Sequence, residues 1–119
     1  MNKMFMNCQN LEELNLSSFK TENVIKMNEM FYSCNTLESL DLSSFNINKV
    51  KSAKKMFENC NQLMYLNLKN FNIKVDENFE GFFSKCNRLE EIYVSKNIND
   101  FIINNLLRDS RIKAKIIKI

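Results

Sequence analysis

The sequence predicts an α/β solenoid, in which four short helix–strand coils stack around one apolar core. The same apolar residues recur every 26 residues over most of the chain, and such a period is typical of stacked repeats. Within each copy the apolar spacing changes from that of a helix to that of a strand. The 119 residues include one glycine and no proline, so we expect asparagine, which tolerates left-handed backbone, to form the turns.

The period is kept through four copies without an insertion. We place the repeats at about 1–26, 27–52, 53–78 and 79–97, followed by a C-terminal cap over 98–119. One such coil cannot bury its own apolar side, so the copies must stack with like positions in columns. These columns are Met4-Phe5, Met30-Phe31, Met56-Phe57 and Phe82-Phe83; Cys8, Cys34, Cys60 and Cys86; Leu11, Leu37, Leu63 and Leu89; Leu14, Leu40, Leu66 and Ile92; Leu16, Leu42, Leu68 and Val94; and Phe19, Phe45 and Phe71.

The second copy illustrates the two halves of a repeat. Four apolar residues at i, i+3, i+4 and i+7 predict a two-turn helix: Met27, Met30, Phe31 and Cys34. Leu40 and Leu42, two residues apart, predict a short strand with one buried face. Stacking then forms a short parallel sheet on one side of the core and a row of helices on the other.

Both ends of the array differ from its middle. We expect Asn99 or Asp100 to begin a helix that buries Phe101, Ile102, Leu106 and Leu107, and Arg108 to Arg111 to leave it. Ile112, Ala114 and Ile116 then alternate as a last strand, which completes a helix–strand cap. Nothing covers the first copy, so we expect either truncation from a longer array or an edge that associates with a second copy of the chain.

The unit Met-Phe-x-x-Cys-x-x-Leu-x-x-Leu-x-Leu-Ser-x-Phe, found at Met30–Phe45, carries a family resemblance. It resembles the BspA-like (Treponema pallidum-type) leucine-rich repeats of surface proteins, and the likeness extends from about Met1 to Ser95. The resemblance implies a leucine-rich-repeat-type solenoid that serves adhesion and protein–protein contact at a cell surface, without catalytic residues. Asn97 stands in the Phe column of the fourth copy, which indicates that the array ends there.

Charge and hydropathy argue against several partners. The net charge of +3 comes entirely from the C-terminal segment, where five basic residues face Asp100 and Asp109; so weak a basic patch makes nucleic acid an improbable partner. No apolar stretch reaches the roughly 18 residues of a membrane span. Met1–Leu11 lacks the features of a signal peptide, so the expectation is a secreted or cell-surface protein by resemblance, with a cytoplasmic one as the alternative. The five basic residues are Arg108, Arg111, Lys113, Lys115 and Lys118.

The residues that usually carry catalysis are missing. The chain has no histidine, and a cysteine every 26 residues fits no zinc pattern. We expect the cysteines to form a column of small buried thiols at helix ends, with disulfides and a metal site as the alternatives. The acidic pairs Glu12-Glu13 and Glu90-Glu91 are expected to be solvated surface. We therefore predict a protein that is not an enzyme and needs no cofactor or metal.

The remaining candidate for function is the outward side of the sheet. If Leu40 and Leu42 point inward, the residues between them point outward, and solenoids bind partners through such faces. We predict a protein–protein interaction or adhesion module; the alternative is an intracellular leucine-rich-repeat scaffold or effector fragment. Tyr65 and Tyr93 are the exposed aromatics, a type enriched at interfaces. The predicted partner-binding residues are Glu13, Asn15, Ser39, Asp41, Tyr65, Asn67, Lys69, Glu91 and Tyr93.

Overall fold

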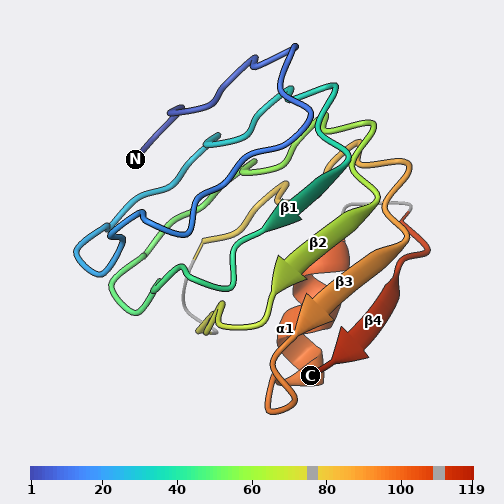
Figure 1. Ribbon diagram of the computed structural model, residues 1–119. Coiled ribbons are helices and arrows are strands. Elements are labelled where there is room, and N and C mark those ends of the chain that lie inside the picture. The colour runs from blue at the N-terminus through green and yellow to red at the C-terminus, as the bar shows by residue number, and fades with distance from the viewer. Residues whose placement is uncertain (75–77, 109–111) are drawn as a thin grey trace.

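A computed structural model describes residues 1–74, 78–108 and 112–119 (Figure 1). It is a small α/β structure with a four-stranded parallel sheet and one helix among these residues. In chain order the elements are β1 (Ser39–Asp41), β2 (Tyr65–Leu68), β3 (Glu91–Val94), α1 (Asp100–Leu107) and β4 (Lys115–Lys118). The strands lie side by side in the order in which they occur in the chain.

The register of the sheet follows the repeat. Leu40 of β1 pairs with Leu66 of β2, and Leu66 pairs with Ile92 of β3, so partners stand 26 residues apart. Ile92 then pairs with Ile116 of β4, which extends the sheet by one strand beyond the repeats. The prediction of a short parallel sheet is confirmed. The first copy, however, has no strand: no backbone hydrogen bond joins residues 12–17 to residues 38–43.

The predicted helices of the four copies are wrong. Their residues form successive tight turns, in which two residues four apart take left-handed backbone, such as Glu29 with a φ of 55° and Ser33 with a φ of 57°. A left-handed residue cannot continue a right-handed α-helix. The same two positions recur with positive φ in every copy: Lys3 and Asn7, Glu29 and Ser33, Lys55 and Asn59, and Gly81 and Lys85.

Hydrogen bonds between copies explain why turns replace helices. The amide of Phe31 donates to the carbonyl of Met56 at 2.9 Å, in the next copy, instead of to Met27 within its own turn. Phe5 donates in the same way to Met30, and Phe57 to Phe82. Every second amide of the first three turn segments is used in this way, so neighbouring copies are joined by backbone bonds on the turn side as well as in the sheet.

The left-handed turns predict whether one substitution raises or lowers the free energy of unfolding. Lys85 is exposed and has a φ of 62°. Lys85→Gly should raise the free energy of unfolding by about 0.5–1 kcal/mol, because glycine adopts left-handed backbone without strain. In a helix the same change would lower it by a similar amount. Urea unfolding distinguishes a turn from a helix at this position. The control is Lys51→Gly, at a position without positive φ, which should be destabilising.

The core lies between the sheet and the turns. Its centre is a row of phenylalanine rings from successive copies: the centroids of Phe5 and Phe31 are 5.4 Å apart, those of Phe31 and Phe57 5.4 Å, and those of Phe57 and Phe83 5.9 Å. Phe82 meets the Phe57 ring edge-on at 5.2 Å. Phe31, Phe57 and Phe83 are almost completely buried. Aromatic rings in such offset or edge-on pairs attract each other, which stabilises the core beyond the effect of burying their apolar area.

The cap has the predicted helix and strand, with one change of face. The side chain of Asn99 accepts a hydrogen bond from the Phe101 amide at 2.8 Å and so caps α1. Ile102, Ile103 and Leu106 are buried, whereas Phe101, predicted to be buried, is 56% exposed. Of the predicted last strand, Ile116 lies in β4, while Ile112 and Ala114 precede it. The predicted exit from the helix at 109–111 lies outside the described residues.

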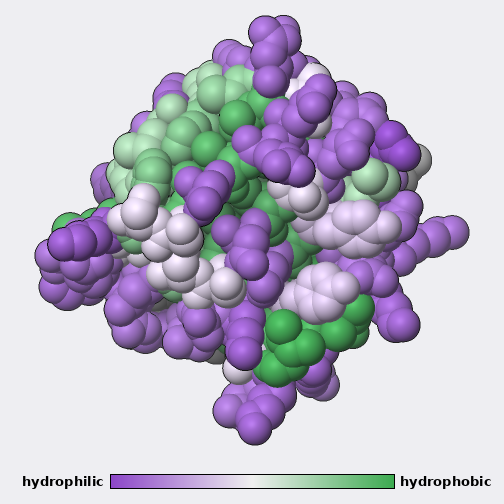
Figure 2. All heavy atoms as spheres, in the orientation of Figure 1, coloured by the Kyte–Doolittle hydropathy of each residue, from purple (hydrophilic) through white to green (hydrophobic). Residues whose placement is uncertain are grey.

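The first copy presents apolar side chains at the edge of the molecule. Met4 is 47% exposed and Ile25 54% exposed, and Phe5 is only partly buried. Figure 2 shows hydrophobic residues gathered at the end where the chain begins. The carbonyl oxygens of Asn2 and Met4 accept no hydrogen bond from any described residue, although the equivalent carbonyls of the second copy do.

Candidate functional site

The outward face of the sheet collects the predicted partner-binding residues into two rows. Ser39, Tyr65 and Glu91 are successive partners across β1, β2 and β3, and the row ends at Lys115 of β4. Asp41, Asn67 and Tyr93 form the adjacent row. These side chains point outward because Leu40, Leu66 and Ile92, which alternate with them, point into the core.

A first hollow lies where the first copy separates from β1. It has a volume of about 340 Å³ and lies between residues 13–17 and the segment from Ser39 to Ser44. Side chains alone bridge the two copies here: the Ser44 hydroxyl donates to the Leu16 carbonyl at 3.4 Å, and the Thr36 hydroxyl donates to the Leu11 carbonyl at 3.0 Å. Four of the predicted residues line this hollow: Glu13, Asn15, Ser39 and Asp41.

A second hollow, also of about 340 Å³, adjoins the first over the middle of the sheet. The two share Ser39 and Asp41, so together they follow the outward face across the strands. Lys69 is exposed just beyond β2 but lines neither hollow, and Glu91 flanks the second one through its contact with Tyr93. The second hollow brings together five of the predicted residues: Ser39, Asp41, Tyr65, Asn67 and Tyr93.

Carboxylates orient both tyrosines. The Tyr93 hydroxyl donates to Glu91, and the Tyr65 hydroxyl donates to Glu90 at 3.4 Å. The negative charge of Glu90 raises the pKa of Tyr65 above its ordinary value, and the hydrogen bond to Glu91 raises the pKa of Tyr93. Both phenols therefore stay neutral at physiological pH, and neither is prepared to act as a base or a nucleophile.

Asp41 is held in its charged form. Its partial burial alone would raise the carboxyl pKa, but hydrogen bonds from Ser43 and Asn67 outweigh this and lower the pKa below its ordinary value. The Ser43 amide donates to Asp41 Oδ1 at 2.7 Å. The same turn occurs in the neighbouring copies, where Ser17 donates to Asn15 and Lys69 donates to Asn67, each at 3.0 Å. Asp41 thus places a fixed negative charge between the two hollows.

The face contains residues that the sequence did not predict as binding residues. Glu90, expected to be solvated surface, contacts Tyr65, and Ile119 lines the second hollow. Glu90 stands one residue before the strand, where Glu12 and Glu38 stand in earlier copies, and this recurrence was the available signal. Ile119 carried no such signal, because it reaches the hollow through the pairing of β4 with β3.

The outward face is acidic although the whole chain has a net charge of +3. Glu12, Glu13 and Glu38 also surround a further hollow of about 490 Å³ at the beginning of the strands. Lys69 and Lys115 supply the positive charge at the outward positions of the repeats and β4. The carboxylates at the outward positions are Glu13, Asp41 and Glu91, and three more stand one residue before the first outward row: Glu12, Glu38 and Glu90.

Comparison with known proteins places the chain in a family. The family model described as "Mycoplasma protein of unknown function, DUF285" matches residues 1–97. The chain belongs to DUF285. No curated protein and no solved structure matches this DUF285 chain.

The described part of the DUF285 chain has neither a cluster of metal-binding side chains nor a membrane-spanning helix. No three cysteine, aspartate or glutamate side chains in residues 1–74, 78–108 and 112–119 lie close enough together to hold a metal ion. None of the helices in these ranges has the length and apolar character needed to cross a membrane.

The four cysteines of this DUF285 chain are free thiols. Cys34, Cys60 and Cys86 are buried, and each thiol donates to the carbonyl of a phenylalanine in the preceding copy, as Cys60 does to Phe31 at 3.0 Å. Burial raises the pKa of Cys34 to about 11 and that of Cys86 to about 12, and it raises the pKa of Cys60 as well. The helix ends expected at these cysteines are absent, because their residues form turns.

Thiol labelling should divide the cysteines into two groups. With an aromatic disulfide reagent, native Cys34, Cys60 and Cys86 should stay unreactive as the pH rises from 7 to 9, because their raised pKa values and burial keep them protonated and inaccessible. Cys8, which is only partly buried, should react. All four should react in urea. Rapid labelling of native Cys8→Ser protein would show that the cysteine column is open.

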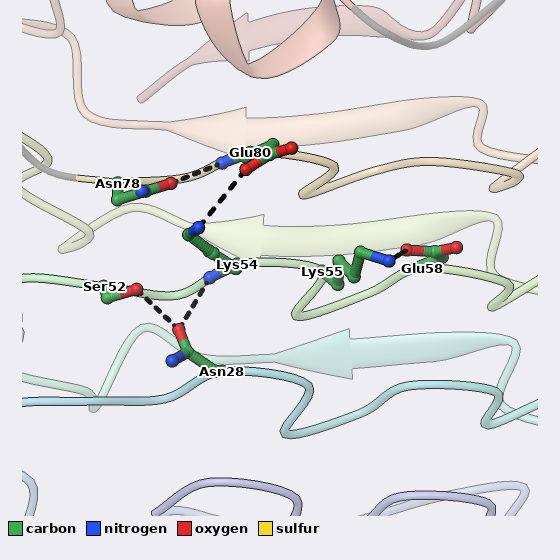
Figure 3. Close-up of polar contacts among 7 residues, drawn as sticks. All are labelled: Asn28, Ser52, Lys54, Lys55, Glu58, Asn78 and Glu80. Atoms are coloured by element: carbon green, nitrogen blue, oxygen red, sulfur yellow. Dashed lines mark hydrogen bonds and ion pairs between the residues drawn. The ribbon is translucent and has the colours of Figure 1, made fainter.

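Polar contacts join the copies on the turn side, opposite the sheet (Figure 3). Asn28 Oδ1 accepts from the Ser52 hydroxyl at 2.7 Å and from the Lys54 amide at 2.9 Å. The Lys54 ammonium lies 3.3 Å from the Glu80 carboxylate. The Lys54–Glu80 ion pair thus joins neighbouring copies, and this side serves as the control surface for experiments on the outward face.

Proposed function

We propose that this chain is a non-catalytic module that binds a protein partner through the outward face of its parallel sheet. The observation that carries the proposal is the convergence of predicted residues: seven of the nine line two adjoining hollows on this face. A continuous polar surface with recessed aromatic side chains suits recognition of a macromolecule. The neutral tyrosines and the ionised Asp41 supply no acid, base or nucleophile of perturbed reactivity.

We further propose that the stacked copies form a solenoid of the leucine-rich-repeat type, related to BspA-like surface proteins. The pairing of residues 26 apart supports this, both in the strands and on the turn side. In such an array each copy contacts only its neighbours, and the concave or flat strand face is free for binding. Adhesion at a cell surface is the role that this relationship favours.

Capture of a partner tests the binding role. The double variant Tyr65→Ala, Tyr93→Ala should lose a protein that the unchanged chain retains from a solubilised extract of surface proteins. Its melting temperature should stay close to that of the unchanged chain, because both side chains lie on the outward side. The matched control is Lys54→Ala, Glu80→Ala, which breaks an ion pair on the turn side. Equal retention by all three proteins would remove the outward face as the binding surface.

The four free cysteines favour a second candidate, an intracellular scaffold or effector, because unpaired thiols are usual in reducing compartments. Protease treatment of intact cells separates the candidates. A surface module is degraded while a cytoplasmic marker survives, whereas an intracellular scaffold survives with the marker.

A further inference from the structure

We infer that the second hollow receives an arginine side chain from an extended basic segment of the partner protein. The inference rests on the proposed function and names the chemistry that the outward face recognises. The hollow combines aromatic walls, from Tyr65 and Tyr93, with the carboxylate of Asp41 and the amide of Asn67. A planar guanidinium can stack on aromatic rings and donate hydrogen bonds to a carboxylate at the same time.

The register of the sheet brings both tyrosines to this hollow. Tyr65 pairs with Glu91, and Tyr93 pairs with Asn67, so the two rings lie diagonally on adjacent strands. Their hydroxyl groups are bound to Glu90 and Glu91, which restricts the orientation of the rings before a ligand arrives. A cation that enters the hollow would come close to both rings, whose electron-rich faces attract positive charge.

The charge of the hollow favours a cation and disfavours an anion. Asp41 lies at its edge, oriented by the Ser43 amide at 2.7 Å. The carboxylates of Glu90 and Glu91 flank the tyrosines, and Lys115 stands at the far strand of the same row. A phosphate group would be repelled by this set of carboxylates, so nucleic acid does not fit the face.

The shape of the face indicates an extended segment. The first and second hollows share Ser39 and Asp41, so a peptide that crosses the strands reaches both. Glu13 lines the first hollow and can pair with a second basic side chain of the same peptide. One arginine would thus enter between the tyrosines, while a neighbouring basic residue would lie near Glu13.

Fluorescence anisotropy with a labelled peptide tests this directly. The probe is fluorescein-Arg-Gly-Arg-Gly-Arg-amide, compared with the same peptide carrying Lys or Glu in place of Arg. We expect the Arg peptide to bind more tightly than the Lys peptide and the Glu peptide not to bind. Tyr65→Ala should weaken binding of the Arg peptide about 5-fold. Tyr65→Phe, which keeps the ring, should retain most of the binding.

The carboxylate is tested by Asp41→Asn, which should weaken binding about 10-fold and reduce its salt dependence. The control Glu80→Gln removes a charge from the turn side and should leave the affinity unchanged. Equal affinity for the Arg and Lys peptides, an equal loss in Glu80→Gln and Asp41→Asn, or binding of a single-stranded oligonucleotide would each overturn the inference. Partner capture that still depends on Tyr65 and Tyr93 would show that such a failure concerns the ligand chemistry and not the binding face.

Discussion

Phe57→Ala is expected to lower the free energy of unfolding by about 3–5 kcal/mol, the usual cost of removing a fully buried phenylalanine. The ring is completely buried and lies within 5.9 Å of three others, from Phe31, Phe82 and Phe83. Its loss opens a cavity in the middle of the ring row and removes contacts with the copies on both sides. A domain of this size is typically stable by about 5–15 kcal/mol, so the loss is a large fraction of the total.

Two other phenylalanines calibrate this result in the same urea unfolding experiment. Phe101→Ala should change the free energy of unfolding by less than about 0.5 kcal/mol, because the side chain is 56% exposed. Phe5→Ala should fall between the two, since Phe5 belongs to the ring row but lies in the partly covered first copy. Equal losses at Phe57 and Phe101 would contradict the order of burial described above.

Adding one more copy in front of the chain is expected to stabilise it by about 1–4 kcal/mol, from the average stability per residue of folded proteins. The insert is residues 27–52, placed directly before Met1, which preserves the 26-residue period. It would cover Met4 and the Phe5 ring and offer amides to the carbonyls of Asn2 and Met4. Urea unfolding should show a higher midpoint and a steeper transition, because more surface is buried.

The control for this experiment is the same insert shortened by one residue at its junction. The shortened insert differs in composition by one residue but shifts every column by one position, so that apolar side chains of the insert no longer meet those of the first copy. It should give little or no stabilisation. If both inserts stabilised the chain equally, register would not matter at this edge, and the stacking of like positions would not be the source of stability.

The strands of the last three copies and the cap helix α1 could be predicted from the sequence, whereas the turns that replace the repeat helices could not. Leu40 and Leu42 alternate with polar residues, and the constant period left one register, which pairs Leu40 with Leu66. The apolar spacing of Met27, Met30, Phe31 and Cys34 is compatible with both a helix and consecutive turns. The choice depends on where the Phe31 amide donates, and its acceptor, Met56, belongs to the next copy. A local pattern holds no information on that bond.

The candidate face also has features that the sequence predicts and features that it does not. Parity along the strand correctly predicted which side chains are on the outward side, Tyr65 and Asp41 among them. The hollow beside Glu13 was not predictable, because it exists only where the first copy fails to pair with β1. The role of Glu90 was missed because its hydrogen bond to Tyr65 links two copies.

Within the tight-turn segments the backbone bonds between copies run in one sense, from the amides of each of the first three copies to the carbonyls of the next. The two ends of this hydrogen-bond ladder therefore differ: among the described residues, the first copy presents unpaired carbonyl oxygens to it and not unpaired amides. Two molecules that met through their first copies on this side would bring oxygen against oxygen at Asn2, Met4 and Met6, with no hydrogen between them. Only a segment that presents its amides to these carbonyls can continue the ladder. Association of two first copies about a two-fold axis cannot do so along these atoms.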